Sequence, residues 1–348
     1  MTTPPRSGSG RLVGRIAGTY PLAATYHLAA LETEMIGVTA TVSELVPEAT
    51  GLELPGKPST VVIGRSEWVE RNLASFSHLI EPVRLHLEER VAESGPGAKS
   101  AAALASRLMQ VEMAAVLGFL ARRVLGQYEL VLPTGEDGDV VAFVGPNIMN
   151  MERTHQFRPA EFRFWVALHE MTHRAQFQGI PWLRDYFMGL VSELVDQSIP
   201  EPGRINRMFG EMASRRESGA AVLDERGLLG LFATPEQSAV IDKVQALMCL
   251  LEGHGHVVMD RLGRQHLKSQ ERMSRVLKNR KLDKRTAAFF RITGLEMKLN
   301  QYKMGEQFVQ AVEKEAGWDT LNLAFRGVGS LPTLAEIEGP KRWLQRVA

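Results

Sequence analysis

His169, Glu170 and His173 form the pattern HExxH within the stretch 167–175. On an α-helix, positions i and i+4 lie on the same face, so the two imidazoles can reach one point in space. Zinc accepts neutral imidazole nitrogens at about 2.0–2.1 Å, and Glu170 is placed to take a proton from a metal-bound water. The pattern therefore predicts a zinc site with hydrolytic chemistry. The competing interpretation is a core helix whose two histidines are merely hydrogen-bonded.

The residues around this pattern favour one uninterrupted helix. The run 161–177 contains neither proline nor glycine, Pro159 suits a first helical turn, and Gly179 suits the end of the helix. Phe162 and Val166 recur with the histidines at helical spacing. We therefore expect both histidines on the stripe that carries buried apolar side chains.

A third protein ligand is expected farther along the chain, because catalytic zinc usually has three protein ligands and one water. The densest candidate cluster is 250–260, LLEGHGHVVMD, where Glu252, His256 and Asp260 share one helical face. We predict Glu252 as the third ligand. Gly253, inside this helix, indicates close approach to its backbone, either by the HExxH helix or by the metal.

Other assignments stay open at this point. His256, or less favourably His254, could replace Glu252 as the ligand, and His155 is the first alternative outside the cluster. If Glu252 is the ligand, His256 becomes a partner of the ligands or a donor to the developing oxyanion, with Asp260 farther away. The cluster could also be an exposed polar helix face with paired charges.

The pairing of LHEMTHRAQF with LLEGHGHVVMD resembles the gluzincin arrangement of zinc metallopeptidases and, more narrowly, the zincin-like metallopeptidase type 2 family. The resemblance covers most of the chain. It implies a mostly α (α+β) zincin-like fold, with a small β-sheet preceding the HExxH helix and Zn²⁺ at His169, His173 and Glu252. Some members of that family are labelled as hydrolases associated with coenzyme F420 biosynthesis, and the resemblance implies no particular substrate.

One residue departs from the usual peptidase helix, in which the position after the second histidine is uncharged. Here that position is Arg174. A guanidinium must reach solvent or a carboxylate, and Asp242 and Glu252 are possible acidic neighbours. This departure makes hydrolytic activity a less direct inference than zinc binding.

Composition limits the partners of this chain. Its 348 residues carry a net charge of +1, which argues against nucleic acid or an anionic membrane as a partner. Cys249 is the single cysteine, so an internal disulfide and a thiolate zinc cluster are impossible and a reducing compartment is favoured. No apolar run has the length of a signal peptide core or a membrane span. We expect a cytoplasmic protein with a peptide or small amide substrate.

Three regions are expected along the chain: a disordered tail at 1–18, a helical region at 19–126 and a zincin-like catalytic region at 127–348. β-favouring runs at 60–63, 128–132 and 140–144 predict strands, the last two as a hairpin or neighbours. A loop or mobile flap is expected at 219–232. The predicted helices, besides the one carrying HExxH, span 22–46, 66–92 with a kink or break at Pro82, 100–125, 182–197, 204–217, 235–262 and 294–316.

Two classes of function fit these residues. In the first, a zinc-dependent hydrolase cleaves an amide or peptide bond, with Glu170 as general base and His256, His254 or Tyr186 holding the oxyanion. In the second, a zinc-bearing scaffold or binding protein uses the metal without catalysis, for which a closed four-ligand site would be typical.

Overall fold

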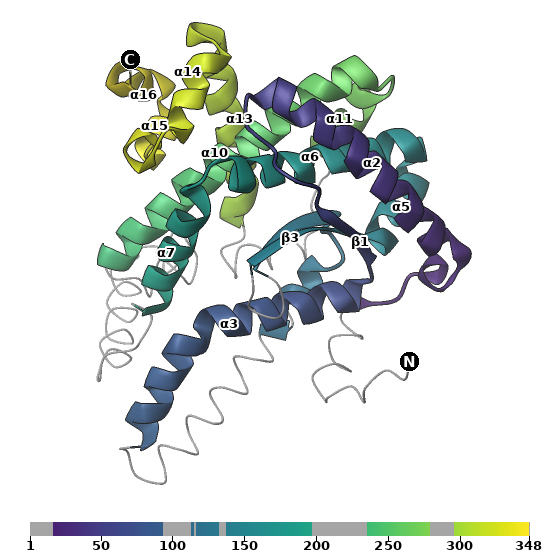
Figure 1. Ribbon diagram of the computed structural model, residues 1–348, viewed down its shortest axis with the longest axis horizontal. Coiled ribbons are helices and arrows are strands. Elements are labelled where there is room, and N and C mark those ends of the chain that lie inside the picture. Colours follow the sequence, from purple (N-terminus) through teal and green to yellow (C-terminus); the bar gives the residue numbers. More distant parts are fainter. Residues whose placement is uncertain are drawn as a thin grey trace, which may run out of the picture. The chain divides into compact units, whose positions relative to one another are not determined.

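The computed structural model describes residues 17–92, 113–114, 116–131, 137–196, 235–278 and 296–347 (Figure 1). The chain divides into two compact units. Unit 1 comprises Met1–Pro181 and Val258–Val276, and unit 2 comprises Trp182–Val257 and Leu277–Ala348. The boundary passes through the long helix α10, Pro235–His266, which therefore contributes residues to both units.

A three-stranded mixed sheet lies at the centre of unit 1, in the order β1-β3-β2. β1 (Ser59–Ile63) is parallel to β3 (Asp137–Val144), and β2 (Gly126–Val131) is antiparallel to β3. All side chains from Val141 to Val144 are buried, as a central strand covered on both faces requires. The β-favouring runs of the sequence are thus confirmed as strands, and the last two form the predicted antiparallel pair.

Helices cover both faces of this sheet. On one face, α2 (Tyr26–Thr50) packs on β1 and against α6 (Pro159–Gly179), which in turn packs on β2. On the other face, α3 (Arg65–Ala92) contributes Trp68 and Val69 to a core shared with Ala142 and Val144 of β3. Figure 1 shows α2 and α3 on opposite sides of β1 and β3. The helix that carries HExxH therefore packs on the sheet as part of the core of unit 1.

Shorter helices complete each unit. Unit 1 also contains α5 (Gly145–His155) and the larger part of α11 (Gln270–Lys278). Unit 2 contains α7 (Leu183–Asp196), α13 (Glu296–Ala316), α14 (Trp318–Asn322), α15 (Leu334–Glu338) and α16 (Pro340–Val347), together with short 3-10 turns. The predicted mostly α fold with a small sheet ahead of the HExxH helix is confirmed.

Two helices continue through prolines at which the sequence favoured a break. α2 includes Pro47 and ends only at Gly51, whose left-handed φ of 72° allows its N–H to reach the Pro47 carbonyl at 2.8 Å. The buried side chains of Val46 and Thr50 hold this last turn in place. α3 likewise runs on through Pro82. The helix predicted to end at residue 46 therefore continues for four more residues, because packing outweighs one lost backbone hydrogen bond.

Several expectations fall on residues that the structure does not describe. These are the tail at 1–18 apart from Ala17 and Gly18, most of the helix at 100–125, the helix at 204–217 and the loop at 219–232. The division into regions 19–126 and 127–348 follows chain order, whereas the compact units do not, and it stays a prediction. Within the described ranges, no helix combines the length and apolar character that crossing a bilayer requires.

In unit 2, the backbones of α10 and α13 touch at a pair of glycines. A β-carbon added to Gly253 would lie 2.1 Å from the carbonyl carbon of Gly305, and one added to Gly305 would lie 1.8 Å from the Cys249 oxygen. The close approach predicted at Gly253 therefore exists, but it is made by α13 and not by the HExxH helix or a metal. The crossing fixes the turn of α10 that carries Glu252.

We predict that Gly253→Ala lowers the free energy of unfolding by about 3 kcal/mol or more, because the new methyl group would meet backbone that cannot rotate away. Gly189→Ala on α7 is the matched control, since no atom lies within 4 Å of its added β-carbon. The control should stabilise the protein by about 0.5–1 kcal/mol, through helix propensity alone. Denaturant unfolding of both variants checks this, and equal stabilities would contradict the crossing.

Candidate metal centre

Helix α6 is buried along most of its surface, and the two histidines of HExxH are its partly exposed positions. Between Trp165 and Gln176, every side chain except those of His169 and His173 is buried. Pro159 occupies the first turn and the helix runs unbroken to Gly179, as the sequence predicted. The two histidines were expected among the buried apolar side chains of the helix. They are instead more exposed to solvent than those side chains.

Arg174 anchors the C-terminal half of α6 to the sheet. Its side chain is fully buried, and Nε and Nη2 each donate to a carboxylate oxygen of Asp139 on β3 at 2.6 Å. Nη2 also donates to the Pro55 carbonyl at 2.5 Å. The expectation that Asp242 or Glu252 would be its acidic neighbour is wrong. The charge that is unusual in a peptidase helix is paired on the side of α6 that faces the sheet.

Arg163 plays the same part in the N-terminal half of the helix. It donates from Nε and Nη2 to the two carboxylate oxygens of Glu152 on α5, at 2.8 and 3.0 Å, and from Nη1 to Glu34 on α2. Bidentate, charge-assisted bonds of this kind fix direction as well as distance. Two arginines thus hold α6 on either side of its histidines.

The two imidazoles meet at their Nε2 atoms, which lie 3.2 Å apart, with the rings nearly perpendicular at 81°. Spacing along the helix predicted that both rings would reach one point. Two ligands of a tetrahedral zinc ion, each about 2.0–2.1 Å from the metal, lie about 3.3 Å apart. The distance between the two nitrogens therefore fits a shared zinc ion.

Gln176 sets the tautomer of His173. Its Oε1 lies 2.9 Å from Nδ1 of His173, and an amide oxygen can only accept, so Nδ1 carries the proton. The lone pair of this imidazole is then on Nε2, the atom that faces His169. Metal-binding histidines commonly have such a partner on the second nitrogen. Gln176 is fully buried, so its amide cannot be replaced easily by water.

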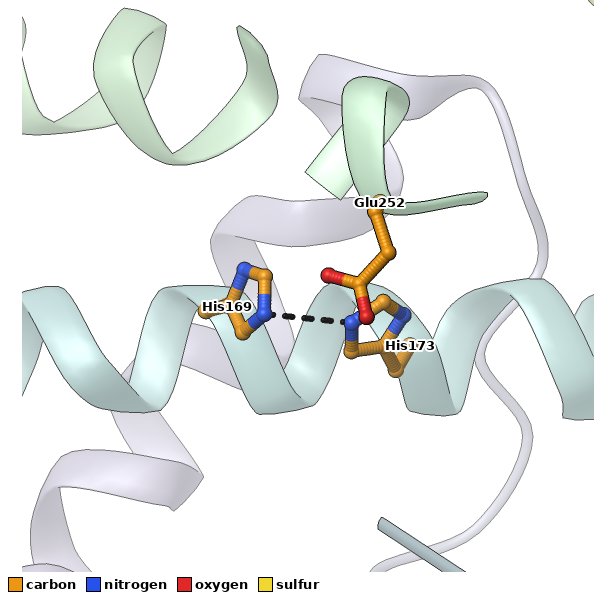
Figure 2. Close-up of side chains that lie close together, drawn as sticks. All are labelled: His169, His173 and Glu252. Atoms are coloured by element: carbon orange, nitrogen blue, oxygen red, sulfur yellow. Dashed lines mark hydrogen bonds between the residues drawn. The ribbon is translucent and has the colours of Figure 1, made fainter. Parts of the chain in front are cut away.

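Glu252 completes the group. One carboxylate oxygen of Glu252 and one nitrogen of each histidine all lie within 4.8 Å of one another. Figure 2 shows both rings on the same side of α6, with the carboxylate directed toward them. Glu252 is buried, whereas both histidines are partly exposed. Two imidazoles and one carboxylate are a donor set that catalytic zinc sites use.

The other candidate ligands have different surroundings. Among the described residues, neither His256, His254 nor His155 belongs to the group. His254 is fully buried in unit 2, where its ring stacks on Trp318 at 5.2 Å and meets the edge of Phe325 at 5.3 Å. The ring of His254 is thus part of an aromatic cluster in unit 2. His256 keeps partial exposure one turn after Glu252.

Asp260 and His155 also face elsewhere. Asp260 accepts a hydrogen bond from Nε2 of Gln270 at 2.8 Å, which links α10 to the start of α11. The carbonyl of His155 accepts from Arg272 at 2.6 Å, and its ring stacks on Phe157 at 5.5 Å. Both residues thus contribute to the packing of unit 1.

Two further groups of unit 2, Cys249 and Tyr186, have shifted pKa values. Burial, with a smaller contribution from Glu252, raises the pKa of the Cys249 thiol to about 12. A thiol that stays protonated at neutral pH is neither a ligand nor a nucleophile. Burial, followed by the charge of Glu193, raises the pKa of Tyr186 on α7. Its hydroxyl therefore keeps its proton and can donate.

Gln176 and Asp139 were not found by sequence reasoning. Gln176 lies three residues after His173, on the same helical face, so the spacing H-x-x-Q was a usable signal. Asp139 has no comparable signal, because it precedes Arg174 by 35 residues and reaches it only through the fold.

We predict that Gln176→Leu lowers zinc affinity about 10- to 100-fold, because Nδ1 of His173 loses its acceptor. Competition with a chromophoric zinc chelator measures this affinity. Gln178→Leu is the matched control, since Gln178 donates to the Tyr128 hydroxyl at 2.7 Å. Equal zinc affinities in the two variants would contradict the role given to Gln176.

Comparison with known proteins identifies the family of this chain. The chain matches the model of the zincin-like metallopeptidase family over residues 15–344. It is 31% identical to a protein from Chloroflexus aurantiacus, whose crystal structure is described as that of a candidate hydrolase with a novel fold. The match has a TM-score of 0.71 and covers 97% of this chain and 96% of the other. No curated protein sequence matches significantly. The chain belongs to the zincin-like metallopeptidase family.

Proposed function

We propose that this protein is a zinc-dependent hydrolase that cleaves an amide bond in a peptide or a small amide. The observation that carries the proposal is the convergence of His169, His173 and Glu252, whose ligand atoms lie within 4.8 Å of one another. Family membership and the likeness to a candidate hydrolase support hydrolytic chemistry at a coarser level.

His169 and His173 would hold the zinc through Nε2, and Glu252 through a carboxylate oxygen. When bound, zinc polarises a water molecule and lowers its pKa from 15.7 to about 7. Among the described residues, three protein ligands converge, and three would leave one position of a tetrahedral site for water, which supports catalysis over a closed structural site. A fourth protein ligand would favour the alternative of a zinc-bearing scaffold.

Glu170 is the general base of the proposed reaction. It follows His169 directly on α6, and its side chain is only 6% exposed. Its carboxylate would accept a proton as the water oxygen bonds to the substrate carbonyl carbon. Glu170 would then donate this proton to the nitrogen as the carbon–nitrogen bond breaks. The products are a carboxylic acid and an amine.

His256 is the donor that we propose for the oxyanion of the tetrahedral intermediate. It lies one turn after Glu252 on α10 and is partly exposed, as a group that meets substrate must be. Tyr186 is the second candidate, since its hydroxyl is protonated at neutral pH. His254 is a poorer candidate than these two, because its ring packs against both Trp318 and Phe325.

We predict that Glu170→Gln retains about one zinc per chain, because it changes no ligand, yet lowers kcat by at least about 10²–10⁴-fold, because the base is lost. Zinc is measured by elemental analysis. Turnover is measured on a pool of internally quenched peptides and N-acyl amino acids, with products identified by mass spectrometry.

A Glu170→Gln variant that works as fast as the native chain would contradict the proposed mechanism. A fully zinc-loaded native chain that cleaves nothing in the pool would favour the non-catalytic scaffold. The label that associates some family members with coenzyme F420 plays no part in this experiment.

A further inference from the structure

Gly126, the first residue of β2, lies directly against the side chain of Glu170. A β-carbon added at Gly126 would lie 2.6 Å from Cγ of Glu170, and 2.8 Å from Cδ and from Oε1. Carbon atoms in contact normally lie about 3.5–4.0 Å apart. The carboxylate of Glu170 therefore occupies the space that any other residue at position 126 would fill with its own side chain.

Close approach, and not backbone conformation, explains this glycine. The glycines of the described chain that have positive φ are Gly18, Gly51, Gly56 and Gly317, and Gly126 is not among them. An L-residue could adopt the backbone conformation of position 126 without strain. Glycine within a strand often marks a place where another group comes close to the backbone. Here that group is the acidic side chain of HExxH.

The start of β2 cannot move away from α6 to make room. Gly126 pairs with Phe143 of the central strand, and Val144 N–H donates to the carbonyl of the preceding Leu125 at 2.9 Å. Farther along the strand, Glu129 accepts two hydrogen bonds from Arg71 of α3, at 2.6 and 2.8 Å. The strand is thus held by the sheet and by the helix on its far face.

The same strand is also tied to α6 beyond the histidines. The Tyr128 hydroxyl accepts a hydrogen bond from Gln178 at 2.7 Å, and the Tyr128 ring stacks on Phe177 at 6.3 Å. Gly126 and Tyr128 are two residues apart, so both face α6. The strand and the helix are both fixed, whereas the side chain of Glu170 can rotate. A methyl group at position 126 would therefore displace the side chain of Glu170.

We infer that Gly126 is a positioning residue for Glu170: the bare backbone at the start of β2 forms the wall against which the carboxylate of the general base is held. The inference rests on the proposed function for its catalytic consequence. Its steric part, the displacement of the carboxylate by any side chain at position 126, does not depend on that function.

Gly126→Ala tests this inference, with Gly64→Ala as the matched control. Gly64 directly follows β1, and no atom lies within 4 Å of its added β-carbon. A crystal structure of Gly126→Ala should show the Glu170 carboxylate rotated away, with α6 and β2 unmoved. Zinc content should stay near one per chain. We expect kcat to fall about 10²-fold with little change in KM, since misplacement by about 1 Å can cost that much.

Gly64→Ala should match the native chain in zinc content and turnover. A Gly126→Ala structure with Glu170 in its native position would overturn the inference, as would an unchanged kcat in an enzyme that Glu170→Gln inactivates. If Glu170→Gln stays active, the proposed function fails, and the position of the carboxylate in the Gly126→Ala crystal still decides the steric part.

A second variant covers the case in which Gly126→Ala does not fold. Gly126→Ala combined with Glu170→Ala removes the atoms that the methyl group would meet. This double variant should fold and melt at the temperature of Glu170→Ala alone, measured by thermal denaturation. A double variant that also fails to fold, while Glu170→Ala folds, would show that the methyl group meets something other than Glu170.

Discussion

A helix buried on most of its sides must satisfy its polar side chains inside the protein, and this constraint shapes α6. Unpaired buried charge is costly, so Arg163 and Arg174 each meet carboxylates from other elements of unit 1. Thr172 donates to the Leu168 carbonyl of its own helix at 2.7 Å. The same helix carries the histidines of the proposed site. The arginines therefore fix the position of the helix on which the histidines lie.

Glycines stand beside both acidic groups of the proposed site, for the same physical reason. The side chain of Glu170 lies against Gly126, and the backbone of α13 lies against Gly253, which is next to Glu252. In each case a missing β-carbon lets another part of the same unit come close. The contact at Gly126 acts on a side chain, which can rotate, whereas the contact at Gly253 acts on backbone, which cannot. The first therefore concerns the proposed catalysis, and the second concerns stability.

Local pattern was enough to predict the strands, most of the long helices and a set of candidate ligands. HExxH on an uninterrupted run placed His169 and His173 on one face, and the cluster 250–260 supplied Glu252 as the preferred candidate ligand, with His256 and His254 as alternatives. β-branched runs marked the strands. These features depend on periodicities of 3.6 and 2 residues, which the sequence displays directly.

Contacts between distant segments could not be predicted in this way. The pairing of Arg174 with Asp139, the passage of α2 through Pro47 and the contact of Gly126 with Glu170 all depend on which surfaces meet in the folded chain. Asp242 and Glu252 were considered as partners of Arg174, and Asp139 was not, because the sequence offers no measure of distance between segments in the fold. Gly253 was correctly marked as a point of close approach, but its partner could not be named before α13 was placed.

The central claim is that one zinc ion is shared by two imidazoles of α6 and one carboxylate of α10. Anomalous diffraction at the zinc absorption edge, on crystals of the zinc-loaded protein, tests it most directly. The account predicts one strong peak about 2.0–2.2 Å from Nε2 of His169, Nε2 of His173 and an oxygen of Glu252. A peak bonded to His254 or His256 in place of Glu252, or a peak that lies away from His169 and His173, would contradict it.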